Sequence, residues 1–136
     1  MTTWWARRMD AEHGTAAVST VMLLVLLLTV GAAAVIGVTD LAAATARART
    51  AADAAALAAA GTSPLVAGAH EPRDTPADAA RRVAQANDAR LLAIRLAQWP
   101  LRVTVEVQVE PATAWVRRAA GRITATAAAA VRPRDG

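Results

Sequence analysis

The feature that most constrains this chain is a long run without any charged side chain, from Gly14 to Thr39. At the rise of an α-helix, residues 15–39 would extend about 37 Å, more than the roughly 30 Å of a bilayer's hydrocarbon core. The sequence therefore predicts a transmembrane helix over residues 15–39. Arg7 and Arg8 precede this helix, and basic residues favour the cytoplasmic side, so residues 1–14 are expected to form a cytoplasmic leader.

A cleaved secretory signal is an alternative interpretation of the same run. Arg7 and Arg8 would form its basic region, residues 18–30 its apolar core, and residues 32–34 its small-residue cleavage site. Apolar sequence continues through residues 35–38, which favours a retained helix. An anchor that is never cut is the third alternative.

A pair of small residues lies within the predicted transmembrane helix. Ala33 and Gly37 are four residues apart, a spacing that would let a second helix approach closely in the membrane. Alanine is so common in this chain that composition alone can also produce such a pair. Ala33 and Gly37 are therefore candidates for helix packing.

Helix-forming sequence continues beyond the apolar run. Residues 40–60, called the stem below, read DLAAATARARTAADAAALAAA and contain neither glycine nor proline. Gly61 suits the left-handed position that often follows a helix end. We expect one continuous helix from about residue 15 through the stem, with Leu41 and Leu57 as its larger contacts to the rest of the protein.

Residues 61–75 have the glycine and proline content of a loop. His70 and Glu71 resemble the first half of the zinc-binding HExxH motif. Pro72 would break the helix that this motif requires, and Asp74 stands where the second histidine belongs. The sequence predicts no metal site there.

A short helix should follow this loop. Thr75 is a suitable N-cap, Pro76 fits the first turn, and Asp78 is placed to complete the cap. The helix is expected to extend to about Asn87. Its predicted apolar side consists of Ala79, Ala80, Val83 and Ala86.

Two later segments alternate between apolar and polar residues, which is typical of half-buried strands. In residues 101–109 the valines share one face, and Pro111 ends the pattern. Residues 123–131 alternate similarly, and residues 90–99 are a candidate third strand. Strands 101–109 and 123–131 are expected to pair antiparallel.

A sheet this small has one apolar face that needs a cover, because small domains bury a low fraction of their surface. The stem is the obvious partner. The predicted fold class is α+β, with a long N-terminal helix packed on a small antiparallel sheet in an extracytoplasmic domain, residues 61–136.

Composition excludes several kinds of site. The chain has no cysteine, which rules out disulfides and thiol nucleophiles. Its histidines, His13 and His70, belong to no catalytic motif, so we expect no enzyme, no cofactor, no metal and no small-molecule substrate. Trp99 and Trp115 are expected in the core or at strand ends.

Arginine pairs offer a different hypothesis. Arg81 with Arg82, and Arg117 with Arg118, are candidates for contact with DNA or another anionic polymer. The net charge of +4 is a mild excess. A secreted domain that binds such a polymer is the alternative function, and nucleic acid is not the expected partner.

The order of these segments resembles a known family. The charged leader, Gly14, the apolar helix, "RARTAADAAALAAAG" at residues 47–61, "ARRVAQAND" at residues 80–88 and two alternating strands look like TadE-like proteins of tight-adherence (Flp) pilus systems. The similarity is greatest to the small proteins of this kind encoded among secretion genes, beside a helicase gene, in high-GC Gram-positive bacteria.

This resemblance implies a pilin-like minor pseudopilin or assembly component of a pilus or related secretion system. Its partners would be the membrane, other subunits and a prepilin-type peptidase that cuts between Gly14 and Thr15. Pilin-type proteins commonly carry a glutamate five residues after the processing glycine, and here that position is Ser19. In such proteins the glutamate is thought to pair with the terminal amine and set the register of subunits, and this role does not carry over to Ser19.

Overall fold

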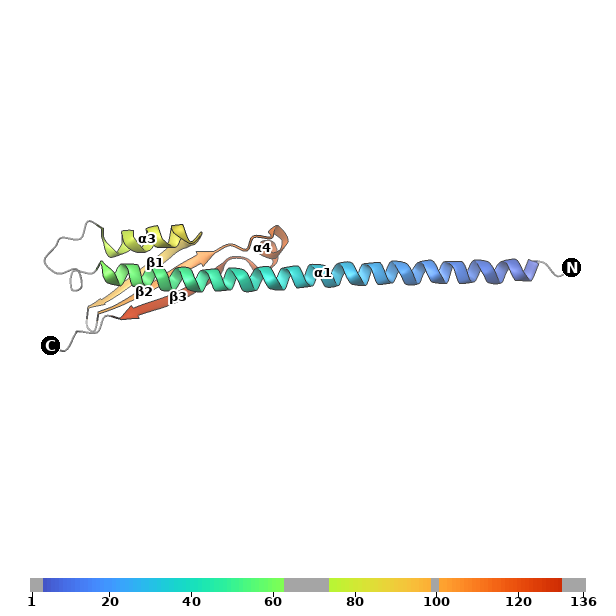
Figure 1. Cartoon of the computed structure of the whole chain (residues 1–136), viewed down its shortest axis with the longest axis horizontal. Helices are drawn as coiled ribbons and strands as arrows, with labels where there is room; N and C mark the ends of the chain where they lie inside the picture. Colours follow the sequence, from blue (N-terminus) through green and yellow to red (C-terminus); the bar gives the residue numbers. More distant parts are fainter. Residues whose placement is uncertain (1–3, 63–73, 99–100, 131–136) are drawn as a thin grey trace. The chain divides into compact units, whose positions relative to one another are not determined.

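The computed structural model describes residues 4–62, 74–98 and 101–130 of the chain. The chain divides into two compact units, Met1–Val38 and Thr39–Gly136. Along the sequence the elements are α1 (Trp4–Gly61), α3 (Pro76–Ala86), β1 (Arg90–Gln98), β2 (Leu101–Val109), α4 (Ala114–Ala120) and β3 (Ile123–Ala130) (Figure 1).

The long helix α1 confirms the expected continuity of the apolar run with the stem, but both of its ends differ from the prediction. It begins at Trp4 rather than near residue 15. Gly61 is its last residue, and its backbone is not left-handed as predicted. Among the described glycines only Gly121 has a positive φ, 72°. Thr62 ends the helix instead, since its hydroxyl donates to the carbonyls of Ala58 (3.2 Å) and Ala59 (3.1 Å).

The second unit contains a three-stranded antiparallel sheet in the order β1-β2-β3, which confirms all three predicted strands. In the central strand, Val105 stands opposite Ile94 of β1 and Ala127 of β3. The register of β1 shifts between Leu91 and Ala93. The predicted valine face is confirmed, because Val103, Val105 and Val107 are fully buried and Val109 is 2% exposed.

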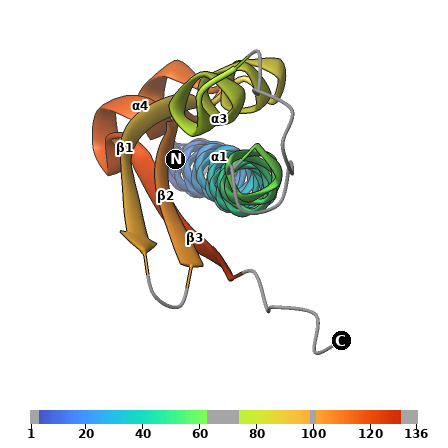
Figure 2. The ribbon, with the colours of Figure 1, turned by 90° about the vertical axis from the view of Figure 1, so that its left-hand side faces the viewer.

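The stem covers this valine face with alanine. Seen along α1, the stem lies on the concave side of the twisted sheet and α3 lies beside it (Figure 2). Spacings of three and four residues place the buried alanines on one side of the helix. They are Ala44, Ala48, Ala51, Ala52, Ala55, Ala56, Ala59 and Ala60, and they form one core cluster with the valines of β2.

The expectation that Leu41 and Leu57 make the main stem contacts is wrong. Leu57 is 68% exposed and Leu41 is 39% exposed. Leu57 lies four residues after Asp53, so it shares the exposed side of the helix with that carboxylate. The position of each residue around the helix decides burial here, and side-chain size does not.

Helix α3 begins as predicted. Thr75 is the N-cap and accepts a hydrogen bond from the backbone N–H of Asp78 (3.2 Å). The predicted apolar side is only partly correct, because Ala84 is buried and Ala86 is exposed. At the other end, the Asn87 side chain donates to the carbonyl of Val83 (2.8 Å) and closes the last turn.

Some predicted features lie outside the described residues. These are most of the loop that was predicted over residues 61–75, together with Trp99 and Val131. One described element was not predicted at all. Helix α4 connects β2 to β3 in a segment for which the sequence reading gave only a strand end at Pro111.

The alanine face predicts a position-specific response to added volume. Ala52 is fully buried in the core cluster, whereas Ala46 is exposed on the same helix. Ala52→Leu should destabilise the domain by about 1–3 kcal/mol through overpacking. Ala46→Leu, the matched control, should change stability by less than about 0.5 kcal/mol. Thermal unfolding of the full chain in detergent, followed by circular dichroism, would measure both; equal effects would contradict this arrangement of the stem.

Candidate functional site

The end of the domain at which the stem begins is held together by one carboxylate. Asp40, at the start of the stem, accepts hydrogen bonds from the backbone N–H groups of Thr113 (2.8 Å) and Ala112 (3.2 Å). These two residues immediately precede α4, and Thr113 is its N-cap residue. The Thr113 side chain makes no capping bond of its own. Asp40 thus fixes α4 to the stem across more than seventy residues of sequence.

The surroundings of Asp40 favour its charged form. The Asp40 side chain is only 10% exposed. Arg47 follows about two helical turns later, and its guanidinium lies 4.0 Å from the Asp40 carboxylate. The hydrogen bond from the Thr113 backbone lowers the pKa of Asp40 most, partial burial opposes this change, and Arg47 adds a smaller decrease. Asp40 is therefore an ionised link that needs no partner outside the protein.

Helix α4 carries the second predicted arginine pair. Arg117 lies 3.9 Å from the Glu110 carboxylate, and Glu110 forms a closer contact of 2.9 Å with Arg122. Arg118 is exposed and has no ion pair within the part of the chain that the structure describes. Trp115 was expected in the core or at a strand end, but it lies in α4 and is 48% exposed.

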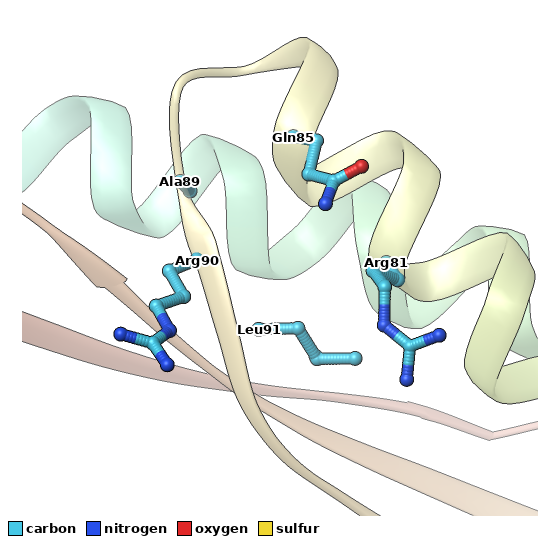
Figure 3. Close-up of a pocket in the computed structure, with 5 residues that line it drawn as sticks. All are labelled: Arg81, Gln85, Ala89, Arg90 and Leu91. Atoms are coloured by element: carbon cyan, nitrogen blue, oxygen red, sulfur yellow. The ribbon is translucent and has the colours of Figure 1, made fainter.

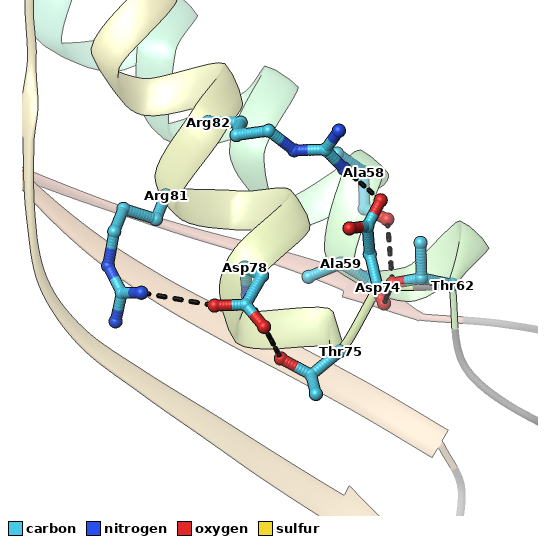
Figure 4. A network of polar contacts seen from close by, with 8 residues as sticks. All are labelled: Ala58, Ala59, Thr62, Asp74, Thr75, Asp78, Arg81 and Arg82. Carbon is cyan, nitrogen blue, oxygen red and sulfur yellow. Dashed lines mark hydrogen bonds and ion pairs between the residues drawn. The ribbon is translucent and has the colours of Figure 1, made fainter. Parts of the chain in front are cut away.

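The first predicted arginine pair, on α3, is engaged with acids of the same segment (Figure 4). Arg82 pairs with Asp74, and Arg81 contacts Asp78 at 3.1 Å. The Thr75 hydroxyl donates to the other Asp78 oxygen (2.6 Å), and this bond lowers the pKa of Asp78 most. These arginines stabilise the start of α3, and the two pairs lie on different helices rather than in one cluster.

A groove lies between α3 and the beginning of β1 (Figure 3). It has a volume of about 460 Å³ and is lined by Arg81, Gln85, Ala89, Arg90 and Leu91. Sequence reasoning did not identify it, because it forms where the two elements meet rather than within a motif.

A second hollow of about 390 Å³ shares Gln85, Ala89 and Arg90 with that groove. It adds charges of both signs, among them Asp88 and Glu110. The mixture does not select one ligand class. Among the described residues, no three histidine, aspartate or glutamate side chains are grouped as a metal site would require.

The predicted membrane residues all lie within α1. Gly14 and Thr15 are in its helical backbone, Ala33 is exposed, and Gly37 is half-buried. The helix is long and apolar enough between Ala16 and Gly61 to cross a membrane, by length and composition. A single-pass anchor is compatible with this finding, and a signal sequence would meet the same criteria.

The chain was compared with protein-family models, curated proteins and solved structures. No protein-family model, no curated protein and no solved structure matches the chain.

The Asp40 link predicts a characteristic pH dependence. A lowered pKa in the folded state means that the carboxylate contributes stability above the unfolded value of about 3.9, and that this contribution is lost as the pH falls through the lower folded value. Asp40→Asn should therefore be less stable than the wild type at neutral pH, and the difference should shrink below about pH 4. Urea unfolding of the full chain in detergent at several pH values would test this.

The matched control is Asp53→Asn, which changes an exposed carboxylate on the same helix. Its effect on stability at neutral pH should be less than about 0.5 kcal/mol, because the side chain is exposed. A stability difference between Asp40→Asn and the wild type that does not vary with pH would contradict the role of the ionised carboxylate.

Proposed function

We propose that this protein is a membrane-anchored minor pseudopilin, or an assembly component, of a Flp/Tad-type pilus or a related secretion system. The observation that carries the proposal is the difference between the two halves of α1. Its first half presents large apolar side chains, and its stem presents a buried alanine face to a small antiparallel sheet. One helix thus has both the composition of an anchor and the packing of a core element.

Exposure of the apolar half supports the anchor. All the large apolar side chains from Val18 to Val38 are exposed, each by at least 54%. Contiguous apolar surface of this extent is avoided in water and marks contact with protein or membrane. Because the run is long enough for the hydrocarbon core, lipid is the environment that fits it best.

The resemblance to TadE-like proteins supports the pilus or secretion assignment. It rests on the leader, Gly14, the segment at residues 47–61 and the strand order that follows. The chain has the α+β arrangement expected from its sequence pattern, a long N-terminal helix packed on a small antiparallel sheet. Ser19, in place of the usual glutamate, makes a role in assembly or as a minor subunit more fitting than that of the principal fibre subunit.

The proposed partners follow from the same features. Ala33 and Gly37 would contact a transmembrane helix of another subunit, since small side chains permit close approach. A prepilin-type peptidase would remove the leader. Residues 40–136 would lie outside the cytoplasm, where the domain could meet other pilus or secretion subunits.

The alternative, a secreted domain that binds an anionic polymer, has less support. Arg81, Arg82 and Arg117 each lie beside a carboxylate, so their charge is partly compensated within the protein. A cleaved signal would also remove the apolar half of α1 and leave only the stem with the domain. Determination of the mature N-terminus distinguishes the two functions.

We predict that the chain is cut between Gly14 and Thr15, because a prepilin-type peptidase needs a small residue before the cut and an apolar helix after it. Mass spectrometry of the membrane-extracted protein should find Thr15 at the N-terminus, and Gly14→Leu should retain the leader. Gly31→Ala, a change in open space further along the helix, should be processed normally. A chain starting near residue 35 would establish the secretory signal instead, and one retaining the first residues would establish an uncut anchor.

We also predict that the domain lies outside the cytoplasm. The chain has no cysteine, so a single Thr126→Cys substitution on the exposed side of β3 gives a unique label site. A membrane-impermeant maleimide should label this variant in intact cells and should not label the wild type. Labelling that requires permeabilised cells would contradict the orientation.

A further inference from the structure

Helix α4 is fixed close to the point where the chain leaves its apolar run. Asp40 directly follows Thr39, the last residue of that run, and consecutive Cα atoms are about 3.8 Å apart. The same Asp40 carboxylate accepts the hydrogen bonds of Ala112 and Thr113. The start of α4 is therefore joined to the residue that would emerge from the hydrocarbon core through one hydrogen-bonded side chain and one peptide unit.

The length of the run places this point among lipid headgroups. Residues 15–39 extend about 37 Å as a helix, whereas a bilayer is roughly 40–45 Å thick with its headgroups. If the run spans the membrane, Asp40 lies in the headgroup layer rather than beyond it. Thr113, hydrogen-bonded to Asp40, must lie at or near the same depth.

We propose that α4 is a membrane-contacting element that binds anionic phospholipid headgroups through Arg118, with Trp115 inserted at the interface. This inference rests on the membrane anchor of the proposed function, and goes beyond it by assigning a lipid-binding surface to the domain itself.

The side chains of α4 suit this surface. Trp115 and Arg118 are three residues apart and thus lie on one side of the helix. Trp115 is 48% exposed and Arg118 is exposed, whereas Val116 is only 4% exposed and packs inward. Tryptophan favours the membrane interface because its ring is apolar and its N–H is polar.

The charge of α4 fits an anionic surface. The helix contains two arginines and no acid. Arg117 lies beside Glu110, but that carboxylate is closer to Arg122. Arg118 has no ion pair among the described residues, so its guanidinium can bind a phosphate without losing an existing partner.

The helix is also held in place before any lipid binds. Asp40 fixes its start, and the N–H of Gly121 donates to the carbonyl of Arg117 (2.9 Å) at its end. Strands β2 and β3 pair directly before and after it, through Val109 and Ile123. Contact with lipid would therefore cost little ordering of the backbone.

The experiment uses the full chain in vesicles and single cysteines that carry a fluorophore. Ala119→Cys reports on α4 while both Trp115 and Arg118 are retained, and Thr126→Cys reports on the outer sheet surface. Ala33→Cys reports on the apolar run. Quenching by nitroxides on lipid headgroups or acyl chains measures proximity, in phosphatidylcholine alone and in phosphatidylcholine mixed with phosphatidylglycerol.

We expect headgroup nitroxides to quench the Ala119 label and not the Thr126 label, most strongly in the presence of phosphatidylglycerol. Arg118→Gln should reduce the phosphatidylglycerol-dependent contact about fivefold, the effect of one basic residue near an anionic surface. Arg95→Gln, an exposed arginine of β1, is the matched control and should leave it unchanged.

The outcomes separate the inference from the anchor. Quenching of the Ala33 label by acyl-chain nitroxides, without quenching at Ala119, would overturn the role of α4 and leave the anchor intact. Absence of quenching at Ala33 would overturn the anchor itself. Equal quenching of the Ala119 label with and without phosphatidylglycerol, unaffected by Arg118→Gln, would exclude recognition of anionic headgroups.

Discussion

The contact between the alanine face of the stem and the valine face of β2 is the interaction on which the second unit depends. Burying each valine contributes about 1.5–3 kcal/mol. Together with Pro111, the valines at 103, 105 and 107 are the largest fully buried side chains among the described residues. Each alanine adds little area, but eight stem alanines between Ala44 and Ala60 are buried in one cluster with the valines of β2. Val103, Val105 and Val107 lose all contact with solvent as a result. Without the stem, the domain would lack the cover of its core.

Much of this arrangement could be predicted because apolar and polar residues alternate along the strands. The alternation in residues 101–109 predicts the buried face of β2, and the alternation in residues 123–131 predicts the half-buried face of β3. Thr75 with Asp78 predicts the start of α3. The stem was harder, because in a segment made almost entirely of alanine every side of the helix is equally apolar. Only the polar residues of the stem indicate which side of the helix faces solvent. Leu57 lies on the same side as Asp53 and is exposed with it.

The link between Asp40 and α4 could not be predicted from local sequence. A capping acid normally lies within the first turn of its helix or just before it, whereas this carboxylate comes from the start of the stem. Helix α4 was therefore missed, although Gly121, with its positive φ, marks its end in the ordinary way. The second hollow beside α3 was missed for the same physical reason, since its walls include residues as distant in sequence as Arg47 and Arg122. The groove between α3 and β1 lies within residues 81–91, but it forms only where these two consecutive elements meet.

In the proposed function one helix serves as both anchor and core element, so the end of the apolar run brings Asp40, and the groups bonded to it, to the membrane surface. A domain on a flexible linker could move away from the bilayer, but here the first core alanine, Ala44, comes one helical turn after Asp40. If the run spans the membrane as proposed, the surface next to Asp40 meets headgroups whether or not it recognises them. An exposed tryptophan, and an arginine without an ion pair in the part of the chain that the structure describes, are what such a position would favour; a buried or acidic α4 is what it would disfavour.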